Sequence, residues 1–153
     1  MTTFDFGNGE VAAHQHSNGG GWVADTATVA ATAYIGPDAL VYDNAQVSGN
    51  ARVYGKALVF DNAQVFDYAV VFGDALVFDN ALVFDNAQVS GNARVYDNAR
   101  AYGNARVFDN AEVYGNAWVF GDARVFDKAR VYGKARVRGN AEVGSERNPH
   151  DDV

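Results

Sequence analysis

A six-residue repeat runs through most of the chain and restricts its fold more than any other feature. Val or Ile recurs at every sixth position from Val23 to Val143, with Ala101 as the exception. Ala precedes each of these positions by two residues, and only Gly21 departs from this rule. No unit gains or loses a residue over the 21 repeats. Self-similarity at a short fixed period is typical of a solenoid.

Each repeat predicts one short strand followed by a corner. A period of six fits no helical stripe, because helical faces recur every 3.5 or 3.6 residues. Ala and Val are two residues apart and therefore lie on the same face of a strand. The pairs Gly-Asn (49–50) and Asp-Asn (61–62) tolerate left-handed backbone angles and mark turns. Three corners close a triangular coil, so we predict an all-β prism of about seven 18-residue coils with Val and Ala inside.

Three short stretches, together with the repeat itself, resemble a known family. The segment IGPDA (35–39), together with the Val/Ala spacing over residues 21–143, resembles the bacterial transferase hexapeptide repeat. The segments DFGNG (5–9) and HQHSNGGGW (14–22) are similar to the start of an uncharacterised subgroup of hexapeptide-repeat proteins. The resemblance implies a left-handed parallel β-helix, association into trimers and, in the enzymes of the family, acyltransferase activity with a His general base.

The chain divides into an N-terminal cap (1–20), the repeat region (21–143) and a polar C-terminal tail (144–153). Within the cap, Phe4 and Phe6 are expected to plug the end of the prism. The lack of cysteine excludes disulfides, Cys-ligated zinc and thiol catalysis. A net charge of −7 disfavours nucleic acid as a partner. No signal peptide or membrane span is recognisable, which favours a cytoplasmic location.

Residues 18 apart are expected to stack on the same outer face. The first face is centred on Val23 and on every eighteenth residue after it, up to Val131. From Val41 on, each of these Val residues is followed by an aromatic residue, the first being Tyr42 and the last Tyr132. Aromatic columns occur on all three faces, so ring stacking that stiffens the prism is the simplest interpretation, and a ligand-binding track is the alternative.

Only the first face also has a run of Leu. We predict a homo-oligomer, with a trimer favoured, through Leu40, Tyr42, Leu58, Phe60, Leu76 and Phe78. The alternative is that the N-terminal segment folds over this strip.

Basic residues gather in the second half of the chain. Residues 1–90 contain 2 basic and 10 acidic side chains, whereas residues 91–153 contain 10 and 9. Six arginines precede the central aliphatic residue of a repeat: Arg94, Arg100, Arg106, Arg124, Arg130 and Arg136. All but Arg136 have an aromatic residue two positions later on the same face, so we expect cation–π pairs. Binding of an anionic glycan or another anion is the alternative.

The Asp column from Asp25 to Asp97 is expected to lie at one corner. We predict that each Asp turns back onto the amides of its own corner and that the Asn side chains beside it bond coil to coil. A Ca²⁺ site on Asp43, Asp61 and Asp79 is the alternative.

His14 and His16 would point the same way in an extended strand and could hold a metal, but a third ligand is not evident. We therefore predict no metal and no cofactor.

No catalytic residue can be assigned. The three histidines, His14, His16 and His150, all lie outside the coils, and the strict repeat leaves no inserted loop to form a pocket. The sequence therefore favours a non-catalytic structural or assembly module, without excluding an enzyme. An acyltransferase-like enzyme and a glycan- or anion-binding surface protein remain the alternatives.

Overall fold

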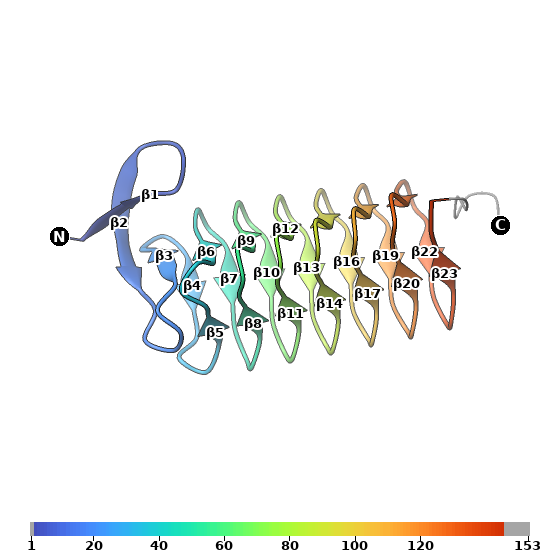
Figure 1. Ribbon diagram of the computed structural model, residues 1–153, viewed down its shortest axis with the longest axis horizontal. Coiled ribbons are helices and arrows are strands. Elements are labelled where there is room, and N and C mark those ends of the chain that lie inside the picture. Colours follow the sequence, from blue (N-terminus) through green and yellow to red (C-terminus); the bar gives the residue numbers. More distant parts are fainter. Residues whose placement is uncertain (1, 146–153) are drawn as a thin grey trace.

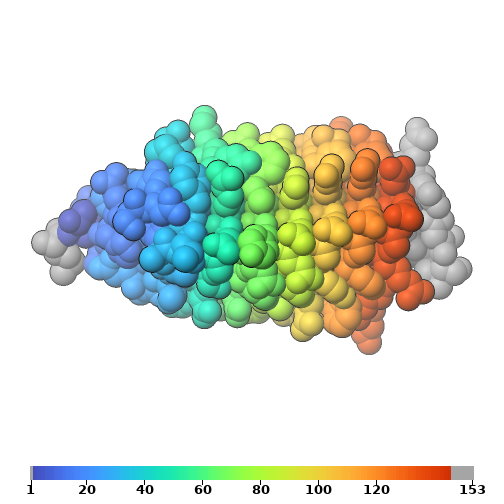
Figure 2. Space-filling view, turned by 90° about the horizontal axis from the view of Figure 1, so that it is seen from below, coloured from blue at the N-terminus to red at the C-terminus, as the bar shows by residue number. Residues whose placement is uncertain are grey.

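The computed structural model describes residues 2–145, which form a parallel β-solenoid without any helix (Figure 1). Coils of about 18 residues stack along one axis in sequence order, so the molecule is elongated (Figure 2). Each repeat strand pairs in parallel with its equivalents one coil away; Val59 lies between Val41 and Val77. The all-β solenoid of about seven coils predicted from the repeat is confirmed. No helix in the described part of the chain is long and apolar enough to cross a membrane.

The strands form three sheets, one for each side of the coil. The first sheet contains β1 (Thr3–Asp5), β2 (Glu10–Gln15), β3 (Trp22–Ala24), β6 (Leu40–Val41), β9 (Leu58–Val59), β12 (Leu76–Val77), β15 (Arg94–Val95), β18 (Glu112–Val113) and β21 (Arg130–Val131). The second contains β4 (Thr28–Val29), β7 (Gln46–Val47), β10 (Gln64–Val65), β13 (Leu82–Val83), β16 (Arg100–Ala101), β19 (Trp118–Val119) and β22 (Arg136–Val137). The third contains β5 (Tyr34–Ile35), β8 (Arg52–Val53), β11 (Val70–Val71), β14 (Gln88–Val89), β17 (Arg106–Val107), β20 (Arg124–Val125) and β23 (Glu142–Val143).

The core is a continuous column of Val and Ala along the axis. The central Val residues from Val41 to Val131 are fully buried, and so is Ala101 at the one position where Val is replaced. Burial of one Val side chain stabilises the fold by roughly 1.5–3 kcal/mol. The column is less well covered in the last coil, where Ala135 is half-buried and Ala141 is exposed.

The corners have a left-handed backbone at their first residue. This residue is Gly or Asp, with φ between 55° and 68° in the regular coils. A Cβ added at Gly55 would lie 2.9 Å from the backbone nitrogen of Gly73 in the next coil. Asp is tolerated at equivalent corners because its carboxylate accepts a hydrogen bond from that amide, as Asp43 does from the Asp61 N–H at 3.3 Å. The expected bond from each Asp to its own corner is therefore wrong.

The N-terminal segment forms a β-hairpin that extends the first sheet. β1 pairs with β2, and β2 pairs with β3, both in antiparallel fashion. The hairpin crosses the N-terminal end of the solenoid in Figure 1. Phe4 stacks on Trp22 at a centroid distance of 4.8 Å, and Phe6 stacks on Tyr42 at 4.9 Å. Both rings therefore lie on the outer face, and the prediction that they plug the prism is wrong.

Candidate functional site

The strip predicted as an interface is assembled on one side of the solenoid. Leu40, Leu58 and Leu76 are paired in register on β6, β9 and β12, and all three are half-buried. Beside them, six rings from Tyr42 to Tyr132 stack with centroid distances of 4.9–5.5 Å and interplanar angles of 3–15°. Stacking occupies the faces of these rings, so their edges are directed outward. The result is a narrow apolar surface over three consecutive coils.

The apolar strip ends where a polar network begins on the same sheet. Arg94 follows Leu76 in register, and Glu112 and Arg130 follow in the next two coils. The Tyr96 hydroxyl donates a hydrogen bond to Glu112 Oε1 at 2.9 Å, and Arg130 Nε lies 3.7 Å from Glu112 Oε2. Burial, reinforced by this bond, raises the pKa of Tyr96. The first face is therefore apolar toward the N-terminus and charged toward the C-terminus.

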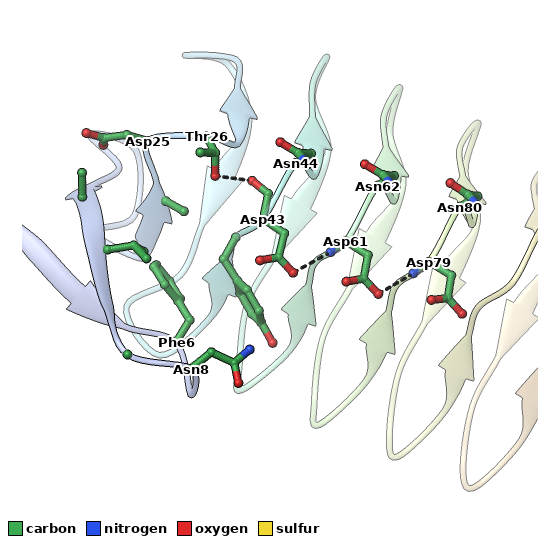
Figure 3. A pocket seen from close by; sticks show the side chains of 15 residues that line it. Phe6, Asn8, Asp25, Thr26, Asp43, Asn44, Asp61, Asn62, Asp79 and Asn80 are labelled. Carbon is green, nitrogen blue, oxygen red and sulfur yellow. Dashed lines mark hydrogen bonds between the residues drawn. The ribbon is translucent and has the colours of Figure 1, made fainter.

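A groove of about 650 Å³ lies between the hairpin loop and the corners that follow the strands of the first sheet, where Asp43, Asp61 and Asp79 stack (Figure 3). Apolar atoms of Phe6, Val11 and Tyr42 line one part of it, and the Asp and Asn side chains of three successive corners line another. Burial raises the pKa of Tyr42, and the nearby carboxylates of Asp43 and Asp61 add to this effect. The sequence did not predict this groove, because the hairpin that forms one wall lies outside the repeat.

The Asp column at this corner forms a ladder of hydrogen bonds between coils. Asp43, Asp61, Asp79 and Asp97 each accept a bond through Oδ2 from the backbone amide one coil further on, at 3.0–3.3 Å. In Figure 3 the carboxylates of Asp43 and Asp61 point along the axis toward the next coil. The Asn residues contribute to coil pairing through the backbone, as the Asn44 N–H does to the Asp61 carbonyl at 2.9 Å. Within residues 2–145, no group of three or more acidic or His side chains has the arrangement of a metal site.

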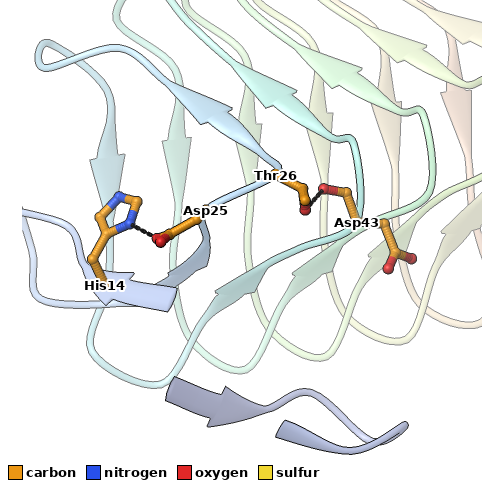
Figure 4. Close-up of polar contacts among 4 residues, drawn as sticks. All are labelled: His14, Asp25, Thr26 and Asp43. Atoms are coloured by element: carbon orange, nitrogen blue, oxygen red, sulfur yellow. Dashed lines mark hydrogen bonds and ion pairs between the residues drawn. The ribbon is translucent and has the colours of Figure 1, made fainter. Parts of the chain in front are cut away.

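His14 and His16 have separate partners. His14 Nδ1–H donates to Asp25 Oδ1 at 2.7 Å, and about half of each side chain is exposed (Figure 4). His16 is buried and donates from Nε2 to the Ala33 carbonyl at 2.8 Å. Asp25 also lines the groove, so the His14–Asp25 pair lies at its edge. His150 belongs to the part of the predicted tail that lies outside the described residues.

The six arginines are distributed over all three sheets and do not form one basic patch. On the second sheet Arg100 and Arg136 lie over the Trp118 ring, with the guanidinium carbons 5.0 and 4.0 Å from its centroid. These cation–π contacts join residues of neighbouring coils, whereas the sequence predicted contacts two residues apart within one coil. Arg136, for which no cation–π contact was expected, makes one of them. Arg124 Nη1 lies 3.9 Å from Glu142 Oε1 on the third sheet.

The fold defines the chain as a β-solenoid repeat protein. The family model of the YdcK beta-solenoid repeat matches residues 45–61 and residues 87–103, each about one coil. Among curated proteins and among solved structures, no protein gave a significant match. The comparisons thus agree with the solenoid, and the resemblance to hexapeptide transferases stays a prediction.

Proposed function

We propose that the protein is a non-catalytic assembly module whose copies associate through the first face. The observation that supports this is the Leu40–Leu58–Leu76 strip, which the β-sheet register places beside the aromatic column. Soluble monomers seldom expose a contiguous apolar strip of this kind. The hairpin rings stack at the N-terminal ends of the two columns, Phe4 on Trp22 before the Leu residues and Phe6 on Tyr42 in the aromatic column. The strip continues beyond them to Phe78. A second copy is the occupant that we propose for it.

The dimensions of the strip indicate how such a contact would be built. A specific interface buries about 800 Å² on each partner, which is more than three half-buried Leu side chains provide. The contact would therefore include the outward edges of Phe60, Phe78 and Tyr96. The charged pair Glu112–Arg130 lies on the same sheet and could set the register between copies. A closed ring of three chains, the form that the hexapeptide resemblance implies, leaves no strip exposed.

Light scattering on the parent and on Leu58→Glu tests this proposal. We expect an oligomeric parent and a monomeric variant with an unchanged circular dichroism spectrum, because Leu58 points away from the core. Gln64→Glu is the matched control, since Gln64 has the equivalent position on the second sheet and is also half-buried. This variant should assemble like the parent. A monomeric parent, or a Leu58→Glu variant with the parent's mass, would contradict the proposal.

The His14–Asp25 pair favours a second candidate function, an acyltransferase-like enzyme. A carboxylate that holds an imidazole nitrogen at 2.7 Å orients the ring and supports its action as a general base. The neighbouring groove provides room for a substrate. Release of free thiol from an acyl-thioester cofactor, abolished in His14→Ala and retained in His16→Asn, would establish this activity.

By contrast, the separation of the arginines over three sheets argues against the glycan- or anion-binding alternative as an extended surface.

A further inference from the structure

The aromatic column of the third sheet is interrupted once, at Ser90. Tyr54 and Phe72 stack at 5.1 Å before the interruption, and Phe108 and Phe126 stack at 5.4 Å after it. The strands directly before these residues, β11, β14 and β17, are paired without a shift, so Ser90 lies in the same column between Phe72 and Phe108. A ring is therefore missing from an otherwise regular stack.

The interruption leaves a hollow in the surface. Its volume is about 270 Å³, and it is lined by Gln88, Ser90, Gly91, Arg106, Phe108 and Asp109. Since neighbouring strands are about 4.8 Å apart, Phe72 and Phe108 are separated by roughly 10 Å, the span of two steps. One additional planar ring fits this span at the spacing that the other rings adopt. Pockets for drug-sized ligands begin at about 300 Å³, so the hollow suits a single ring.

The polar side chains around the hollow have unused hydrogen-bonding capacity. Within residues 2–145, Arg106 has no carboxylate partner, and the Gln88 amide and the Ser90 hydroxyl make no side-chain hydrogen bond. Arg106 is exposed, and its partner in register is Arg124, whose Nη1 lies 3.9 Å from Glu142 Oε1. Asp109 already accepts a bond at 3.2 Å from the Asp127 amide. The unused groups are thus a cation and two donors, which favour an anion.

We propose that this hollow binds a small aromatic carboxylate. The ring would occupy the missing position of the column above Ser90, with one face against Phe108, the aromatic residue that lines the hollow. The carboxylate would receive hydrogen bonds from Arg106 and from Gln88 or Ser90, and repulsion by Asp109 would keep it away from the corner. This site lies on the third sheet and is independent of the assembly surface on the first.

Titration of isotope-labelled protein with benzoate, followed by the amide resonances of Ser90 and Gly91, tests the site. We expect saturable shifts with a dissociation constant of about 1 mM, because one ring and one charge contribute limited binding energy. Two probes separate the contributions: cyclohexanecarboxylate keeps the charge without the planar ring, and benzamide keeps the ring without the charge. Each should bind roughly tenfold more weakly than benzoate.

Two substitutions with matched controls complete the test. Ser90→Phe should fill the column, raise the melting temperature and abolish the benzoate shifts. Ser48→Phe, which adds a ring at the open end of the second-sheet column, should leave them unchanged. Arg106→Gln should weaken binding roughly tenfold, whereas Arg52→Gln, in the same row but stacked on Tyr34 and Tyr54, should not. Absence of saturable shifts, equal binding of benzamide, or persistence of binding in folded Ser90→Phe would overturn the proposal.

Discussion

At the scale of single residues, the corner aspartates combine backbone conformation with hydrogen bonding. Asp61 has φ of 56° and accepts a bond from the Asp79 amide at 3.2 Å. In Asp61→Ala this hydrogen bond is lost, while the side chain's Cβ still disfavours the left-handed backbone conformation. We therefore expect the substitution to lower the unfolding free energy by about 2 kcal/mol. Asp61→Gly should lose only about 1 kcal/mol, and Asp61→Asn should stay close to the parent. Urea denaturation of the three variants measures this order.

Calcium provides the control for this prediction, because ion binding is the competing interpretation of the same column. Carboxylates that are already bonded to amides should leave the melting temperature unchanged when millimolar Ca²⁺ and then EDTA are added. A rise of several degrees with Ca²⁺ that disappears in Asp61→Asn would show a cation site instead. An Asp61→Ala variant as stable as the parent would contradict the hydrogen-bond ladder.

The sequence predicted the corners but not the partners of the corner side chains. Gly and Asp at a fixed place in each repeat indicate a left-handed turn, because few residues adopt that conformation without strain. Whether Asp43 bonds to its own corner or to the next one depends on the stacking of the coils. Likewise, Arg136 pairs with Trp118 of the preceding coil, 18 positions earlier. Such contacts become visible only when the strand register is known.

At the scale of elements, the repeat strands could be predicted and the N-terminal hairpin could not. The strands follow from one alternating pattern repeated without insertion, so the register of every coil is fixed by the first. Residues 1–20 have no such period, and apolar side chains there were assigned to the core. Antiparallel pairing places Phe4 opposite Val11 and directs its ring to the outer side, toward Trp22. The left-handed sense of the coil, which rests on the resemblance, stays a prediction.

The two ends of the solenoid differ as elements. At the N-terminus, β2 pairs with β3 of the first sheet. The Gly21 amide donates to the Ile35 carbonyl of β5, the edge strand of the third sheet, at 3.0 Å. The edges of two of the three sheets are therefore hydrogen-bonded to the N-terminal segment. At the other end, β21, β22 and β23 are the last strands of their sheets within the described residues. The exposure of Ala141 agrees with this difference. Within residues 2–145, the last coil therefore has a neighbouring coil on one side only.

At the scale of the whole molecule, stability should be a sum of contacts between neighbouring coils. A defect in the middle then removes contacts on two sides, whereas a defect at the end removes them on one. Val77 is fully buried in the middle of the stack, and Val137 is 3% exposed in the last coil. Asp at position 77 would bury a charge without a partner, which costs several kcal/mol. Asp at position 137 could reach water by opening the last coil.

We therefore expect Val77→Asp to abolish folding and Val137→Asp to remain folded with a small loss of melting temperature. Circular dichroism distinguishes the two variants. Hydrogen exchange should then show faster exchange in Val137→Asp over residues 127–145 alone, with the coils around Val77 protected as in the parent. Equal loss of structure in both variants would mean that the solenoid unfolds as one cooperative unit. A Val77→Asp variant that melts like the parent would contradict the nearest-neighbour description, because a buried charge at the centre would then cost nothing.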